Sequence, residues 1–259
     1  MDLRLQDKVI LVTGGAKGIG AAIVRACAAE NAKVVVVDRD ADYGEKLEAE
    51  VSSGGKCCFV LADLGTEESC FQAVEQAAGK FGKLDALVNN AGVNDKVGLE
   101  NGNPREYLAS LHRNLVHYYS MAHYALPHLK ASKGSIVNVG SKTAVTGQGG
   151  TSGYASSKGA IMALTREWAV ELLPYNIRVN TVVPAEVMTP LYKQWLKTFP
   201  DPDEKLRTIT SNIPLEKRMT TAEEIAATAV FLISSRSSHT TGQHLFVDGG
   251  YVHLDRGVT

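Results

Sequence analysis

The chain has 259 residues, 44% of them hydrophobic, and a formal net charge of -1 at pH 7. This length and apolar content allow one domain with a large core, and the near-neutral charge argues against nucleic acid or an anionic membrane as the main partner. No apolar run approaches the ~20 residues that a membrane-spanning helix needs. The first residues contain no apolar signal core and the four cysteines fit reduced thiols, so we expect a cytoplasmic protein.

Short apolar runs alternate with helical periodicity along the chain, as is typical of strands buried on both faces of a parallel sheet. The predicted strands are residues 9–12, 33–37, 58–61, 86–88, 135–139, 177–183 and 244–247. The predicted helices are residues 19–30, 67–81, 105–129, 152–173 and 222–234. This order predicts an α/β protein with a three-layer α-β-α Rossmann fold, a seven-stranded parallel sheet and a single domain. Arg178 is unusual in a predicted buried strand, because charged side chains are rarely buried.

A glycine-rich turn, TGGAKGIG at residues 13–20, follows the first predicted strand. Its glycines let the backbone approach a pyrophosphate, which the N-terminus of the next helix attracts. The spacing is G-x-x-x-G-x-G rather than G-x-G-x-x-G, and a lone glycine cluster is often only a turn. Asp38, at the end of the second strand, could bind an adenosine ribose and would repel a 2′-phosphate, which favours NAD over NADP. Lys17 and Arg39 argue the other way, since either could pair with that phosphate, although both also fit solvated surface charge.

Tyr154 and Lys158 lie four residues apart in the predicted helix 152–173, on one face and one turn from each other. An ammonium group beside a phenol favours the phenolate, so we expect Lys158 to lower the pKa of Tyr154 until it can act as a base near neutral pH. Either residue alone also fits a solvated helix position. The pair gains weight from the nucleotide site that precedes it.

The chain resembles the short-chain dehydrogenase/reductase family over nearly its whole length. The resemblance is carried by the glycine turn at 13–20, Asp63-Leu64, the NNAG motif at 89–92, Asn114, Ser141, Tyr154-x-x-x-Lys158, and Pro184 with Thr189. It implies an NAD(P)-dependent enzyme that acts on CH–OH groups, with residues 1–100 mainly binding the dinucleotide and residues 101–259 carrying catalysis and substrate binding.

The resemblance also implies roles for single residues. Tyr154 would be the general base, and Lys158 would lower its pKa and bind the nicotinamide ribose. Ser141 would donate to the substrate oxygen, and Asn114 would hold a water that links Lys158 to solvent. The cofactor-binding candidates are Gly14, Lys17, Gly18, Ile19, Asp38, Arg39, Asp63, Leu64, Asn90, Ala91, Gly92, Tyr154, Lys158, Pro184, Val187 and Thr189.

Further expectations concern assembly and metal binding. In relatives the helices that match 105–129 and 152–173 pack against another subunit, so we expect a homotetramer. No metal is expected, because His112, His117, His123 and His128 are spaced by five and six residues rather than the three or four that metal pairs on a helix need.

The substrate loops are similar to those of bacterial L-fucose dehydrogenases, which oxidise the anomeric carbon of a deoxy sugar to a lactone. The segments that carry this likeness are 92–95, 114–124, 141–148, 184–192 and 246–256. The substrate-binding candidates are Asn94, Ser141, Lys142, Gln148, Tyr154, Glu186, Tyr192 and Trp195. Polar groups of this kind replace the water around a polyol such as L-fucose, L-galactose or D-arabinose, and the two large aromatic residues could form an apolar wall.

Three alternatives stay open at this point. Lys142 and Glu186 could simply face solvent. The enzyme could instead be a hydroxysteroid or 3-oxoacyl reductase, although such pockets are lined mainly by apolar groups. A non-catalytic dinucleotide sensor is the third possibility, but Tyr154 and Lys158 are both present.

Residues 201–205, with a proline and several charges, are predicted to be part of a mobile lid.

Overall fold

A parallel sheet with the strand order β3-β2-β1-β4-β5-β6-β7 forms the middle layer of the protein. The computed structural model describes residues 2–52 and 54–254. The strands are β1 Val9–Thr13, β2 Lys33–Asp38, β3 Cys57–Leu61, β4 Ala86–Asn89, β5 Ser135–Val139, β6 Arg178–Pro184 and β7 His244–Val247. All six neighbouring pairs are parallel. The predicted seven-stranded α/β fold is therefore confirmed, with each strand end within one residue of its predicted position.

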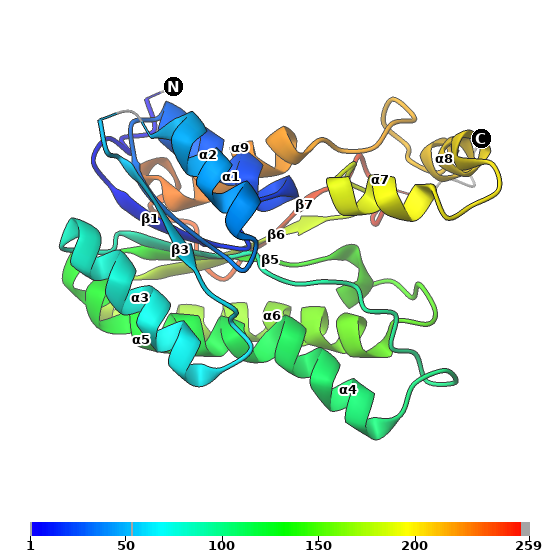
Figure 1. Cartoon of the computed structure of the whole chain (residues 1–259), viewed down its shortest axis with the longest axis horizontal. Coiled ribbons are helices and arrows are strands. Elements are labelled where there is room, and N and C mark those ends of the chain that lie inside the picture. Colours follow the sequence, from blue (N-terminus) through cyan, green and yellow to red (C-terminus); the bar gives the residue numbers. More distant parts are fainter. Residues whose placement is uncertain (1, 53, 255–259) are drawn as a thin grey trace.

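Helices cover both faces of this sheet (Figure 1). The upper layer in the figure contains α1 Gly18–Ala29, α2 Ala41–Val51 and α9 Ala222–Ile233. The lower layer contains α3 Glu67–Phe81, α4 Pro104–Leu111, α5 His117–Ser132 and α6 Ser152–Glu171. Two further helices, α7 Pro190–Leu196 and α8 Pro202–Ser211, lie together at one end of the molecule.

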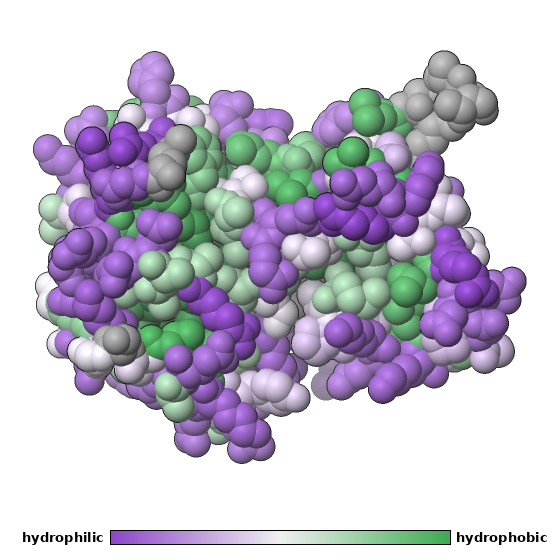
Figure 2. All heavy atoms as spheres, turned by 90° about the horizontal axis from the view of Figure 1, so that it is seen from above, coloured by the Kyte–Doolittle hydropathy of each residue, from purple (hydrophilic) through white to green (hydrophobic). Residues whose placement is uncertain are grey.

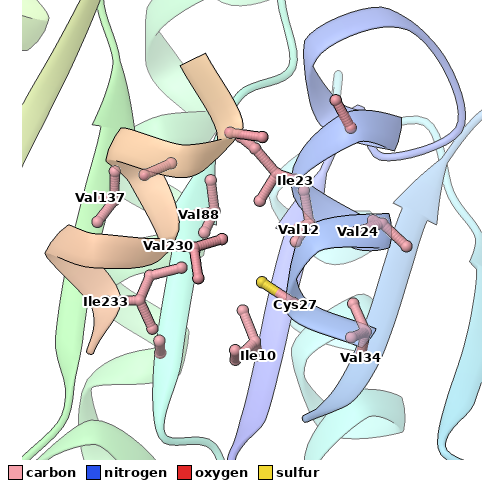
Figure 3. Packing of buried hydrophobic residues seen from close by; sticks show 14 of the residues in the cluster. Ile10, Val12, Ile23, Val24, Cys27, Val34, Val88, Val137, Val230 and Ile233 are labelled. Atoms are coloured by element: carbon pink, nitrogen blue, oxygen red, sulfur yellow. The ribbon is translucent and has the colours of Figure 1, made fainter. Parts of the chain in front are cut away.

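The core consists of two hydrophobic clusters, one on each face of the sheet. Successive side chains of a strand point to opposite faces, so Ile10 and Val12 belong to the upper cluster while Val9 and Leu11 belong to the lower one. Figure 3 shows the upper cluster, where Cys27 of α1 and Val230 of α9 meet above the strands. This two-sided burial explains why the strands read as continuous apolar runs.

Arg178 does begin a strand, and its guanidinium group caps the C-terminal end of α9. It donates hydrogen bonds to the carbonyl oxygens of Leu232 at 2.7 Å, Ile233 at 3.0 Å and Ser234 at 3.2 Å. The last carbonyls of a helix lack intrahelical partners and carry partial negative charge, so a cation is favourable there. The charged residue that looked wrong for a buried strand therefore joins the sheet to the upper helix layer.

Several elements were missed or wrong in the sequence-based prediction. The predicted single helix 105–129 is divided into α4, a π-helical turn over His112–Val116, and α5. Residues 201–205 form the N-terminal end of α8, a helix that was not predicted, where the Asp201 carboxylate accepts a hydrogen bond from the Glu204 N–H at 2.8 Å; their part in a mobile lid stays a prediction. Helices α2 and α7 were not predicted at all.

The surface mixes hydrophilic and hydrophobic side chains, as Figure 2 shows for the face that carries α1, α2 and α9. Within residues 2–52 and 54–254, no helix combines the length and the hydropathy that crossing a membrane requires.

Candidate active site

The candidate residues follow the carboxyl ends of the strands. From β1 the chain moves outward to β2 and β3, and it then returns to the other side of β1 with β4. In parallel α/β sheets, ligands bind outside the carboxyl ends of the strands at such a reversal. Gly14, Asp38, Asp63, Asn90 and Ser141 lie at or just after the carboxyl ends of β1, β2, β3, β4 and β5, in that order, so the fold brings the predicted set to one edge.

The glycine turn packs closely against neighbouring segments at the N-terminus of α1. Gly14 has a φ of 59°, and a Cβ there would lie 2.8 Å from the Ala91 Cα atom. Gly18 has a φ of 57°, and a Cβ there would lie 3.3 Å from Thr189 Cγ2, so the turn also approaches the segment between β6 and α7. Backbone N–H groups at a helix N-terminus and the positive end of the helix dipole suit a pyrophosphate, so this edge fits a dinucleotide. Ile19 is half-buried and packs against the upper core.

Asn90 braces this turn. Its side-chain amide donates to the carbonyl oxygens of Thr13 at 3.0 Å and Gly14 at 2.9 Å. The Thr13 hydroxyl in turn accepts hydrogen bonds from the backbone N–H groups of Asn90 and Ala91. Asn90 thus holds the nucleotide loop together, and its predicted contact with the cofactor stays a prediction.

The carboxylate of Asp38 organises the corner where the adenosine ribose was expected. It accepts hydrogen bonds from the Ala16 N–H at 3.0 Å and from the Asp40 N–H at 3.1 Å. Lys17, which could have paired with a 2′-phosphate, instead forms an ion pair with Asp40 at 2.6 Å. Arg39 is exposed beside a cavity of about 550 Å³ that Asp63 also lines. Leu64 packs against the lower core.

Tyr154, Lys158 and Ser141 meet at the end of β5. Tyr154 is half-buried in the first turn of α6, and the Lys158 Nζ atom lies 5.6 Å from the centre of its ring. Ser141 is buried and forms a hydrogen bond with the Tyr154 phenol. Lys158 is 2% exposed and donates to the carbonyl oxygen of Val139 at 2.7 Å. The structure therefore brings together the three residues that the resemblance implied.

The predicted direction of the Tyr154 pKa shift is wrong for the protein without ligand. Burial raises the pKa of Tyr154 above its usual value, and the hydrogen bond with Ser141 offsets only part of this rise. Burial also lowers the pKa of Lys158 to about 7, so its charged form is only partly populated at neutral pH. A Lys158 amine that is only partly charged stabilises the Tyr154 phenolate little. The prediction was wrong because the spacing of the two residues does not report their burial.

Asn114 lies in the π-helical turn and is fully buried. Its side-chain oxygen accepts a hydrogen bond from the Val93 N–H at 2.7 Å, and its amide donates to the Ser110 carbonyl oxygen at 3.1 Å. A Cβ at Gly92 would lie 3.1 Å from the Asn114 Oδ1 atom and 3.8 Å from the Lys158 Nζ atom. The π turn, a feature that often marks functional sites, thus brings Asn114 next to the space beside Lys158.

Lys142 and Glu186 form a buried ion pair close to Ser141, so the alternative that both face solvent is wrong. Lys142 is 8% exposed, and its Nζ atom lies 4.0 Å from the centre of the Tyr251 ring. The Tyr192 hydroxyl donates to the second oxygen of Glu186 at 2.7 Å. Trp195 packs edge-on against Tyr192, with ring centres 5.0 Å apart.

The remaining predicted binding residues lie at the border of the site. Gln148 is exposed, and Asn94 is half-buried and accepts a hydrogen bond from the Lys96 N–H. Pro184 ends β6, and Val187 is buried and forms a bridge with Thr220. These positions border the site without adding a buried polar contact to it.

Sequence reasoning missed two tyrosines. Tyr118 lies beneath the site and accepts a hydrogen bond from Lys158, while Tyr251 covers Lys142 from the C-terminal segment. Tyr118 lies in segment 114–124 and Tyr251 in segment 246–256, both of which carried the likeness to L-fucose dehydrogenases. No local pattern indicates their contacts, because both depend on how distant elements pack.

Comparisons with known proteins agree with this geometry. A family model described as "Enoyl-(Acyl carrier protein) reductase" matches residues 14–252. L-fucose dehydrogenase of Bos taurus is 37% identical over 251 residues, which cover 96% of this chain and 91% of the relative. The 3-oxoacyl-acyl-carrier-protein reductase of Thermotoga maritima is 36% identical over 253 residues, which cover 96% of this chain and all of the relative.

Solved structures are similar over the same length. Cj0485 dehydrogenase is 47% identical, with a TM-score of 0.95 and coverage of 100% of this chain and 99% of that one. The ligand-free aldohexose dehydrogenase of Thermoplasma acidophilum is 29% identical, with a TM-score of 0.89 and 98% of each chain covered. The 3-ketoacyl-acyl-carrier-protein reductase of Brucella melitensis, complexed with NADH, is 34% identical, with a TM-score of 0.86 and coverage of 96% and 99%.

Proposed function

The chain belongs to the short-chain dehydrogenase/reductase family, and on this basis we propose that it oxidises a sugar at its anomeric carbon with NAD. The substrate that we propose is L-fucose, together with related aldoses such as L-galactose and D-arabinose, and the product is the lactone. Membership of the family establishes an oxidoreductase that uses NAD(H) or NADP(H). The sugar and the choice of NAD are the proposal.

The observation that carries the sugar assignment is the polar cluster beside Ser141, in which Lys142 is buried and Glu186 and Tyr192 are partly buried. Removing charged groups from water costs free energy unless they find hydrogen-bond partners. Several sugar hydroxyls would match the donors and acceptors of this ion pair. Trp195 adds an aromatic face next to these groups, against which a pyranose ring and a methyl group could pack. Relatives named L-fucose dehydrogenase and aldohexose dehydrogenase support the same class.

In the proposed reaction, Tyr154 accepts the proton of the anomeric hydroxyl as the C–H bond on the same carbon breaks. Ser141 donates a hydrogen bond to the substrate oxygen and so stabilises the charge that develops there. Lys158 favours the phenolate of Tyr154 when its ammonium is charged, and Asn114 holds the water through which the proton leaves. The hydride that leaves the same carbon would be accepted by the oxidised dinucleotide when it is bound.

The preference for NAD rests on Asp38 and on the ion pair between Lys17 and Asp40. The Asp38 carboxylate is fixed by two backbone N–H groups, so it cannot easily turn away from a 2′-phosphate. Since Lys17 is paired with Asp40, one of the two cations that argued for NADP already has an acidic partner.

A second candidate is reduction of a 3-oxoacyl substrate. It is favoured by an aromatic row in which Trp195 packs on Phe199 as well as on Tyr192, which offers apolar area to an acyl chain. Relatives named as 3-oxoacyl reductases have comparable identity. The ion pair of Lys142 and Glu186 weighs against it, because an acyl chain would take water away from these charges without offering them hydrogen bonds.

The decisive experiment follows NADH formation with L-fucose, L-galactose, D-arabinose and a panel of secondary alcohols, using NAD and NADP in parallel. A 3-oxoacyl thioester with NADH or NADPH tests the second candidate. The Tyr154→Phe variant serves as the inactive control, with turnover lower by about 10²–10⁴-fold. Activity with the thioester and none with any sugar would overturn the sugar assignment, and full activity of the Tyr154→Phe variant would overturn the mechanism.

We further propose that the chain forms a homotetramer in the cytoplasm. Exposed hydrophobic side chains on the lower layer support the assembly: Leu108 of α4, Tyr119 of α5 and Val170 of α6 are each more than half exposed. Sedimentation velocity measures the assembly directly, and a monomer would contradict it.

A further inference from the structure

A second tyrosine lies beneath the candidate catalytic pair. Tyr118, in the first turn of α5, is fully buried and is among the largest side chains with no exposed surface. Its hydroxyl donates a hydrogen bond to the carbonyl oxygen of Val139 at 3.1 Å and accepts one from the Lys158 Nζ atom at 3.0 Å. Because its own proton is directed at Val139, the hydroxyl oxygen faces the lysine as an acceptor.

These contacts fix two of the three N–H directions of the Lys158 ammonium group. One N–H points to the Tyr118 hydroxyl and one to the Val139 carbonyl oxygen. A Cβ at Gly92 would lie 3.8 Å from the Nζ atom, so the absence of a side chain there leaves room beside the amine. The third N–H is thus left for a group entering the site at the carboxyl edge of the sheet.

We propose that Tyr118 is a positioning residue for the reaction: its hydroxyl anchors the Lys158 ammonium group below the Tyr154 ring and favours the charged form of the lysine. The inference rests on the proposed roles of Tyr154 and Lys158, but it does not depend on which alcohol is oxidised. It adds to the four predicted catalytic residues one that does not touch the substrate.

The surroundings of Lys158 explain why the Tyr118 hydroxyl would affect the charge state of the lysine. Burial lowers the pKa of Lys158 to about 7, so a small loss of stabilisation discharges the amine at neutral pH. The titratable groups that face it are Tyr154 on α6 and Tyr118 and His117 on α5, while β5 contributes a backbone carbonyl. Burial lowers the pKa of His117 to about 4 and raises that of Tyr118, so both are neutral near pH 7.

The first test measures Lys158 directly in the protein without cofactor. Lysine ε-carbon resonances are followed by NMR over pH 5 to 11 in the unmodified protein and in the Tyr118→Phe variant, which removes one oxygen and keeps the ring. We expect the Lys158 midpoint to fall by about one unit, a tenfold change, because the ammonium loses an acceptor. An unchanged midpoint in a folded variant would overturn the proposal, whatever the substrate proves to be.

The second test uses steady-state kinetics with the alcohol that the substrate panel above shows to be oxidised. In the Tyr118→Phe variant we expect kcat for oxidation to fall about tenfold near neutral pH, with the half-maximal pH displaced upward and KM for NAD within about twofold. The matched control is Tyr124→Phe, which removes a hydroxyl from the same helix that bonds Glu67 outside the site. A purely structural role would lower the melting temperature and leave the pH profile in place, and that result would contradict the inference.

A third measurement needs no variant. An ammonium group held by two buried acceptors exchanges its protons slowly, so the unmodified protein below pH 6.5 should give a protected Lys158 signal in a ¹H–¹⁵N spectrum selective for lysine side chains. The Lys158→Met variant assigns the signal by its loss. If no protected lysine signal disappears in that variant, the proposed anchoring is refuted.

Discussion

The ion pair of Lys142 and Glu186 allows stability and substrate binding to be tested separately. The Glu186 side chain is 14% exposed, and in the Lys142→Met variant its carboxylate would keep only the Tyr192 hydroxyl as a partner among the contacts described above. Removing one partner of a buried pair costs about 3–5 kcal/mol, and the remaining hydrogen bond argues for the lower end, about 3 kcal/mol. For a domain of this size, we expect the melting temperature to fall by roughly 6–12 °C.

The double variant Lys142→Met/Glu186→Gln removes the uncompensated charge and keeps an acceptor for Tyr192. We expect it to recover most of the lost stability, to within about 1 kcal/mol of the unmodified protein, because the penalty came from the unpaired carboxylate. Activity should not recover, since both groups proposed to bind sugar hydroxyls have been replaced. The two variants would therefore have different stabilities and the same loss of kcat/KM for the sugar.

The assays are thermal unfolding by circular dichroism and NADH formation over a range of sugar concentrations. Arg25→Met is the matched control, because it breaks an ion pair with Glu50 in which both side chains are about half exposed. Such a pair contributes at most about 1 kcal/mol. Equal melting temperatures for the single and double variants would refute the energetic reasoning, and an unchanged KM for the sugar in both would refute the proposed binding role.

Three further predictions concern cofactor choice, catalysis and pH. The Asp38→Ser variant should raise KM for NAD about tenfold and reduce the discrimination against NADP, as measured by kcat/KM with each dinucleotide. The Lys158→Met variant should lose about 10²–10⁴-fold in kcat without a lower melting temperature at pH 7, since it removes a buried amine; a large fall in stability would contradict this. The pKa of His117 lies at about 4 in the folded chain, below its ordinary 6.5, so the unfolded chain binds the proton first. The neutral His117 therefore contributes to the free energy of unfolding fully above pH 6.5, and this contribution, on the order of 3 kcal/mol, is lost as the pH falls toward 4. Urea titrations at several pH values should show a smaller dependence of the unfolding free energy on pH in the His117→Gln variant.

The strands and the location of the site were predictable because both depend on local pattern. The valine-rich run 33–37 and the serine-to-valine run 135–139 read directly as buried strands. The order of strands and helices then placed the glycine turn, Asp38 and Ser141 at one edge of the sheet. The division of the chain into a dinucleotide-binding part and a catalytic part stays a prediction, as do the individual roles of the site residues.

Features that depend on distant contacts were not predictable. Residues 105–129 keep a helical pattern through the π turn, so nothing in the sequence marks the point that presents Asn114. The direction of the Tyr154 pKa shift depends on burial, which the spacing to Lys158 does not report. The sequence left open whether Lys142 faces solvent, and its burial depends on Glu186 and Tyr251, which lie far along the chain.

The reversal of strand order between β1 and β4 separates two kinds of evolutionary change. The glycine turn and Asp38 lie on one side of this point, whereas Lys142, Glu186 and Tyr192 follow β5 and β6 on the other. Under the proposed function, mutations after β5 and β6 would alter which alcohol is accepted while the dinucleotide loops stay intact. Relatives of similar identity carry names as different as L-fucose dehydrogenase and cyclopentanol dehydrogenase, as such a separation would allow. Recombining the stretch 185–215 between such relatives is accordingly a practical way to build new specificities on this scaffold.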